Sequence, residues 1–97
     1  MKPKMQTESE WRAWLHRQAH RFTCCHNEAG DWVQETLLAF WQRFGSLPWE
    51  PRWLEDSEYQ RACGWCCQKL HSLAVDAHKR AFRQHEILIL DDARWGG

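Results

Sequence analysis

Five cysteines and six histidines are the residues of this chain best suited to metal or thiol chemistry. His20 and Cys24 are four positions apart, and Cys63 and Cys66 are three apart, so each pair lies on one face if its segment is helical. Two such pairs on packed helices would supply the four ligands of a tetrahedral zinc site. The alternative, favoured by the sequence, is that the thiols are small buried hydrophobes. We therefore expect no resident metal or cofactor, and zinc stays open as an alternative.

Catalytic motifs are absent from the sequence. It contains no glycine-rich phosphate loop, no His-Glu-x-x-His and no nucleophile motif. A cysteine with a histidine nearby is too common in this composition to imply catalysis. The polar faces of the predicted segments carry four further histidines to which we assign no specific role, namely His16, His26, His78 and His85. We expect a protein that is not an enzyme.

The elements that position these residues are predicted to be helices. Thr7 to Glu10 forms a capping box, and the apolar residues from Trp11 to Cys25 then recur every three or four positions. Residues 27–30 are the expected break before a second helix, which should stop at Gly45. The two prolines of residues 45–56 exclude one regular helix there, so we expect a loop or short helical turn that Trp49 and Trp53 hold against the body.

The last third of the chain predicts the longest helix. A second capping box at residues 57–60 starts it, and helical spacing continues to about Phe82. Gly64 is expected to bend this helix or to admit a close neighbour, and residues 87–90 are expected to form an extended tail. The predicted fold is all-α, a compact bundle of three long helices with room for one short helix. It forms a single domain over residues 1–92, with a short tail over 93–97.

Length and composition narrow the class further. Ninety-seven residues leave no room for a second core, and eight Trp with 43% hydrophobic residues argue for a packed domain. No segment is apolar enough for a membrane span or a secretory signal, so we expect a cytoplasmic protein. The net charge is zero, but acids concentrate in residues 26–58 and bases in residues 1–25 and 59–85. This segregation is typical either of two chemically different partners or of solvated helix faces.

Two motifs in order resemble region 2 of bacterial sigma factors, especially of the extracytoplasmic-function group. The first is the run Asp-Trp-Val-Gln-Glu-Thr-Leu-Leu at residues 31–38, followed by Trp41. The second is Trp65, then Leu-Ala-Val-Asp at residues 73–76, then a basic cluster at Lys79, Arg80 and Arg83. The resemblance covers about residues 11–92, including the acidic pair after Leu90.

The resemblance implies a module that binds the coiled-coil clamp helices of the RNA polymerase β′ subunit. Carried over by position, the polymerase-binding residues would be Asp31, Gln34, Glu35 and Leu38. Their spacing suits one helix face that offers carboxylates and an apolar anchor to a partner. The alternative is that Asp31 and Glu35 only complement the positive end of their own helix.

The same resemblance implies contact with promoter DNA at the minus-ten element. The expected DNA-binding residues are Arg61, Lys69, His71, Ser72, Lys79, Arg80 and Arg83. Trp65 would either stack on an unstacked base or, as its apolar stripe favours, pack in the core. The helix departs from the family pattern, with Ser72 in place of the usual Asn and with Gln68 and His71 in place of Arg, so we expect weak DNA binding from this domain alone.

A rival interpretation belongs to a different class. The sequence shows no second helical domain for the upstream promoter element, which suggests either an excised domain or a stand-alone half-factor that needs a partner sigma subunit or meets an anti-sigma protein. The rival is a sigma-like helical interaction or regulatory protein, zinc-bound or not, without promoter recognition of its own.

Overall fold

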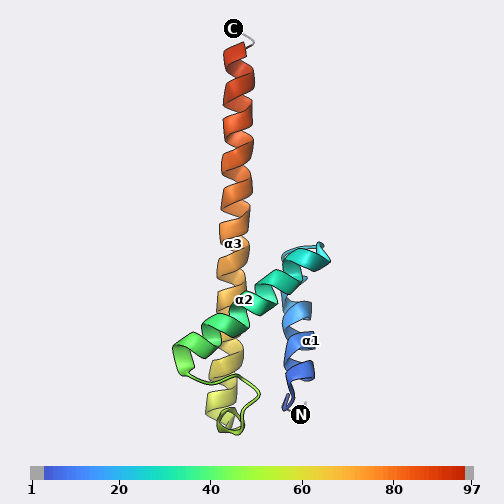
Figure 1. The fold of residues 1–97 in the computed structure, drawn as a ribbon, viewed down its shortest axis with the longest axis vertical. Helices are drawn as coiled ribbons and strands as arrows, with labels where there is room; N and C mark the ends of the chain where they lie inside the picture. Colours follow the sequence, from blue (N-terminus) through green and yellow to red (C-terminus); the bar gives the residue numbers. More distant parts are fainter. Residues whose placement is uncertain (1–3, 96–97) are drawn as a thin grey trace.

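Three long helices and one short helical turn make up the protein. The computed structural model describes residues 4–95, and within them the side chains of residues 4–81. The elements are α1 (Glu8–Ala19), α2 (His26–Phe44), the 3₁₀ turn η1 (Pro51–Trp53) and α3 (Asp56–Trp95). Figure 1 shows α1 and α2 packed against the N-terminal half of α3, with α2 crossing it. The predicted all-α bundle is confirmed, and residues 4–95 contain no strand.

The first helix begins as predicted and ends earlier. The Glu10 amide donates to Thr7 Oγ1 at 3.2 Å, and the Thr7 hydroxyl donates to the Glu10 carboxylate at 3.0 Å, which forms the expected cap. The predicted continuation to Cys25 is wrong, because α1 ends at Ala19. After Ala19 the backbone amides donate to carbonyls three residues earlier, Arg21 to Gln18 at 3.1 Å and Phe22 to Ala19 at 2.9 Å. Such tight 3₁₀-type turns are common at the end of an α-helix.

The second helix starts where a break was predicted. Residues 27–30 are helical, since α2 begins at His26 and its first internal bond joins the Ala29 amide to the Cys25 carbonyl at 3.0 Å. Its end is as predicted, with Gly45 in the left-handed region at φ 70°. The loop that follows is held by Trp53, which is fully buried and donates from Nε1 to Ser46 Oγ at 3.0 Å.

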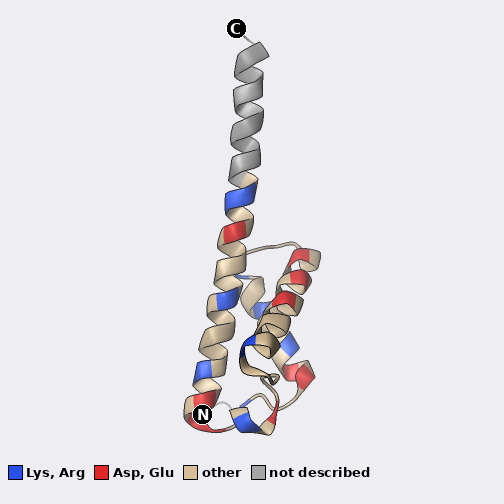
Figure 2. Ribbon diagram, turned by 60° about the vertical axis from the view of Figure 1, so that its left-hand side comes forward, with Lys and Arg blue, Asp and Glu red and all other residues tan. Residues whose placement is uncertain are grey.

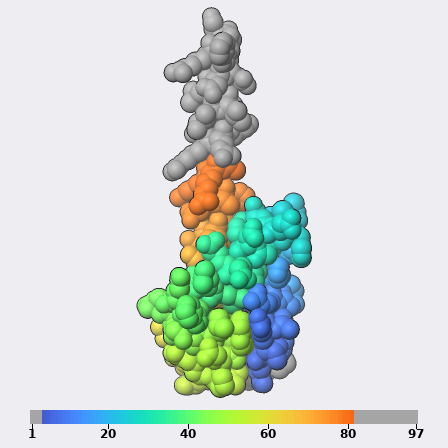
Figure 3. Space-filling view, in the orientation of Figure 1, coloured from blue at the N-terminus to red at the C-terminus, as the bar shows by residue number. Residues whose placement is uncertain are grey.

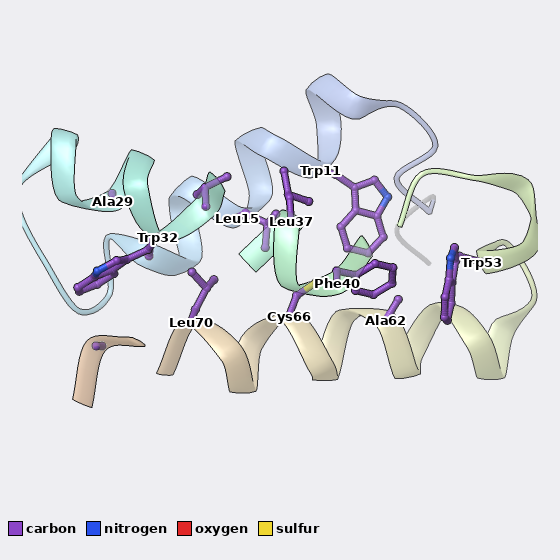
Figure 4. Close-up of a cluster of buried hydrophobic side chains, with 13 residues drawn as sticks. Trp11, Leu15, Ala29, Trp32, Leu37, Phe40, Trp53, Ala62, Cys66 and Leu70 are labelled. Carbon is purple, nitrogen blue, oxygen red and sulfur yellow. The ribbon is translucent and has the colours of Figure 1, made fainter. Parts of the chain in front are cut away.

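A core of apolar side chains from all four elements fills the space between the helices (Figure 4). The largest side chains of this core are aromatic. Phe40 of α2 lies 4.6 Å from Phe44, 5.0 Å from Trp53 and 5.5 Å from Trp65, measured between ring centroids. Aromatic contacts of this kind bury much apolar area and fix ring orientations. Phe40 therefore joins α2 to η1 and α3 at one point.

The third helix is longer than predicted. It starts at Asp56, so Ser57 lies inside it, and it runs without a break to Trp95. Residues 87–90 belong to this helix, and the predicted extended tail is wrong. Apart from its chain neighbours and the backbone of its own helix, Gly64 has no heavy atom within 4 Å of the place where a side chain would begin, so the predicted close approach is wrong as well. Residues 65–95 contain neither Gly nor Pro, which removes the usual causes of a helix end. Over the described residues, no helix has an apolar run long enough to cross a membrane.

Candidate functional site

The four residues predicted to bind a protein partner share one exposed face of α2. Asp31, Gln34, Glu35 and Leu38 are all exposed, because the helix turns its other side to the core. Trp41 extends this face by one turn. Leu38 and Trp41 are each 53% exposed, an unusual fraction for large apolar side chains. We call these five residues the α2 face.

The acids of the α2 face lie too far from the N-terminus of α2 to stabilise the positive end of its helix dipole. Since α2 begins at His26, Asp31 and Glu35 come after the first turn, and the dipole effect is confined to that turn. The first-turn acid is Glu28. In Figure 2 the acidic segments follow one another along the N-terminal part of α2. The explanation that Asp31 and Glu35 only complement their own helix end is therefore weakened.

A groove of about 450 Å³ opens beside the apolar end of the α2 face. Its walls come from α1, α2 and the loop after α2, which meet on the side of the molecule seen in Figure 3. Arg12 of α1 pairs with Glu8 at 2.9 Å and donates to Gln34 Oε1 at 3.5 Å. The groove is lined by Glu8, Arg12, Gln34, Leu37, Leu38, Trp41, Leu47 and Trp49. An apolar side chain of a partner would enter here next to polar groups that fix its orientation.

The residues predicted to bind DNA are spread along and around α3 rather than gathered in a cluster. Arg61, Ser72 and Lys79 are exposed and lie near one another in angle around α3, with Arg61 and Lys79 about 27 Å apart along the axis. Figure 2 shows the basic segments of α3 separated from one another along the helix, with an acidic segment between two of them. By sequence that acid is Asp76, three positions before Lys79. His71 and Arg80 are exposed too, Lys69 is half-buried, and the Arg83 side chain lies outside the described residues. We call the exposed members, with Lys69, the α3 face, although His71 and Arg80 lie about half a turn apart around the helix.

Two members of the α3 face have partners within the protein. The guanidinium of Arg61 lies 5.2 Å from the Phe44 ring centroid and 3.7 Å from the Glu58 carboxylate. The His71 ring meets the edge of Phe22 at 5.6 Å. Lys79 and Arg80, by contrast, are exposed, and neither forms a salt bridge or a cation–π contact with the side chains of residues 4–81. They are the cations of this face most available to phosphates.

Trp65 packs against the core rather than presenting a free ring. It is half-buried, and its ring lies edge-on to Phe40 and Phe44, each at 5.5 Å between centroids. A base that stacked on Trp65 would have to displace these contacts. The packing interpretation favoured from the sequence is supported.

The thiols predicted as alternative zinc ligands do not converge. Cys66 is fully buried in the core, whereas Cys24 is exposed in the connection between α1 and α2. Burial raises the pKa of the Cys66 thiol, and it raises the pKa of Cys63 and Cys67 as well. Without a metal ion these three thiols therefore stay protonated, as buried thiols in apolar surroundings do. Their role as small core hydrophobes agrees with the preferred sequence interpretation.

A group of three histidines gathers instead where α1 joins α2. Among the residues that the structure describes, His16, His20 and His26 form the one group of three or more candidate ligands. The pKa of His16 is lowered by burial first, and then by the neighbouring His26, His20 and Arg12. The sequence interpretation gave His16 and His26 no role. The sequence shows that His16 and His20 are four positions apart, as on one helix face. The predicted break at residues 27–30 places His26 before the connection, whereas His26 is the first residue of α2.

Comparisons with protein-family models, with curated proteins and with solved structures each found no match for this chain.

Proposed function

We propose that this protein is a transcription-initiation module, in which the α2 face binds the clamp helices of the RNA polymerase β′ subunit and the α3 face contacts opened promoter DNA at the minus-ten element. The observation that carries the proposal is the exposure of the whole sigma-like motif surface. Asp31, Gln34, Glu35 and Leu38 all point away from the core, although the motif as a whole contains several buried residues.

The chemistry of the α2 face supports a protein partner with basic and apolar side chains. Carboxylates at Asp31 and Glu35 are suited to bidentate pairing with arginine. Leu38 and Trp41 supply the apolar contact area beside them, and the adjoining groove receives a side chain from the partner. Interfaces concentrate their binding energy in such central aromatic and apolar anchors, surrounded by polar groups.

The α3 face supports a weaker and less specific contact with nucleic acid. Arg61 and Lys79 share one side of α3, which suits a sugar-phosphate backbone, but the charges are widely spaced and Arg80 lies about 100° around the helix from Lys79. Affinity for single-stranded promoter DNA should therefore be low and salt-sensitive. In the complex, the polymerase supplies the remaining contacts.

The decisive experiment measures binding to an isolated β′ clamp-helix fragment by isothermal titration. Glu35→Lys replaces a carboxylate with an ammonium group and should weaken binding by at least tenfold, since truncating a paired interface charge typically costs about 2–5 kcal/mol. The control is Glu55→Lys, the same charge reversal at another exposed glutamate, in the loop before α3. Absence of binding by the unaltered chain, or equal affinities for Glu35→Lys and the unaltered chain, would reject the proposal.

A second candidate function is favoured by the sparse charge of the α3 face. Under it, the protein binds the polymerase through the α2 face and regulates or assists another sigma subunit without reading DNA. Fluorescence anisotropy with single-stranded minus-ten DNA at low salt separates the two candidates. Clamp binding with no detectable DNA binding would favour the regulator.

A further inference from the structure

Three imidazole side chains meet at the corner between α1 and α2. His16 lies in the last turn of α1, His20 caps its C-terminus, and His26 is the first residue of α2. Each offers one ring nitrogen, and these three nitrogens lie within 4.8 Å of one another. The ring centroids are 5.5–6.5 Å apart. Two helices and the connection between them thus supply one potential ligand set.

The backbone around this corner is held by hydrogen bonds. The His20 amide donates to the His16 carbonyl at 3.0 Å, and the Cys25 amide donates to Thr23 Oγ1 at 3.1 Å. On the α2 side, the Ala29 amide donates to the Cys25 carbonyl at 3.0 Å. Ligand sites are most precise when regular elements and their local hydrogen bonds hold the ligands. The three histidines fulfil this condition.

The hydrogen bonds of the rings leave nitrogen lone pairs available. His20 Nδ1 lies 3.1 Å from the Thr23 carbonyl, and because a carbonyl only accepts, this bond places the proton on Nδ1 and leaves the Nε2 lone pair free. A backbone carbonyl that fixes the tautomer in this way is a common partner of metal-bound histidine. His16 Nδ1 is buried and has no hydrogen-bond partner at all. Buried polar nitrogens are normally paired, so this one lacks an interaction that a ligand would provide.

We propose that His16, His20 and His26 bind one zinc ion, which ties the end of α1 to the start of α2. Zinc–nitrogen bonds of about 2.0–2.1 Å in tetrahedral geometry place the ligand nitrogens about 3.4 Å apart. His20 and His26 are exposed, so their rings are free to make the small rotations that close the present spacing. The fourth position is left to water, as in other zinc sites where the protein supplies three ligands. Imidazole nitrogens suit zinc better than they suit magnesium or calcium.

The test is zinc titration of the full chain, prepared without a polyhistidine tag and stripped with a chelator. We expect one zinc per chain and a higher Tm with zinc present. His20→Gln and His26→Gln should each weaken zinc binding at least about tenfold, because even the loss of a residue that only orients a ligand costs 10–100-fold. Both side chains are exposed, so the helical circular dichroism spectrum should be unchanged.

The matched control is His78→Gln, an exposed histidine on α3 outside the group, which should bind zinc as the unaltered chain does. A Cys24→Ser/Cys25→Ser double variant should keep most of the affinity. Zinc binding that survives both histidine variants, or that is absent from the unaltered chain, overturns the proposal. The site and its test are independent of polymerase binding.

Discussion

The two faces of the molecule differ in the kind of partner they can hold. The α2 face combines carboxylates with two apolar side chains that are half-exposed, and it borders a groove. The α3 face has no large exposed apolar side chain within the described part of α3, and it offers cations spread along and around the helix. Protein interfaces need buried anchors, whereas phosphate binding needs only charge in a row.

The contrast teaches that one small core can support two separate binding chemistries. The buried sides of α2 and α3 pack against each other, so their exposed sides point in different directions. Substitutions on one face should leave the other unaffected, whereas damage to the core should remove both together.

The largest effect is expected from Phe40→Ala. This ring is fully buried among Phe44, Trp53 and Trp65, and its loss should cost about 3–5 kcal/mol of unfolding free energy. Denaturant unfolding followed by circular dichroism measures this loss. Clamp and DNA binding should fall together, and Gln42→Ala, an exposed neighbour, should change stability by less than about 0.5 kcal/mol. A stable Phe40→Ala protein that keeps only one activity would contradict the common core.

A smaller effect, confined to the α2 face, is expected from Trp41→Ala. Because this ring is 53% exposed, its removal should leave the unfolding free energy nearly unchanged. Clamp affinity should fall by about 2 kcal/mol, or roughly 30-fold, if the ring is an interface anchor. Isothermal titration measures the affinity. Full affinity in Trp41→Ala would show that the charges of this face, and not its apolar end, make the contact.

The α3 face is tested by the double variant Lys79→Gln/Arg80→Gln. Each phosphate contact with a single strand contributes about 0.7 to the slope of log affinity against log salt, so losing two should reduce the slope by about 1.4. Anisotropy with single-stranded DNA over a salt series gives this slope, and clamp binding should not change. Arg17→Gln, an exposed cation on α1, is the control and should keep the original slope. An unchanged slope in the double variant would remove these two cations from the DNA contact.

The smallest effect is expected from Gly64→Ala on the exposed side of α3. A methyl group there meets no atom within 4 Å beyond its chain neighbours and its own helix backbone, and alanine should stabilise the helix by about 0.5–1 kcal/mol. Gly45→Ala is the opposite case, because φ is 70° and a side chain there is strained. Thermal melts of the two variants should shift in opposite directions. A loss of stability in Gly64→Ala would indicate that α3 needs the glycine.

Local sequence signals determined much of the helical framework. The Thr7 cap, the stop at Gly45 and the anchoring of the loop by Trp53 were all predictable, because each depends on residues close together in the chain. The exposure of Asp31 and Glu35 followed from the apolar spacing of α2. These features need only helical periodicity and capping chemistry.

Tertiary structure alone decided where α1 ends and what meets at that point. Periodicity continued through Phe22 and Cys25, so no local signal marked Ala19 as the end. Phe22 turns instead toward His71 of α3, a contact between residues 49 positions apart. That turn brings His26 back to His16, and packing also shaped the groove beside Leu38. Contacts between residues that are distant in the sequence can override local helix propensity. Local sequence patterns do not contain these contacts, so only the folded structure shows where they end a helix.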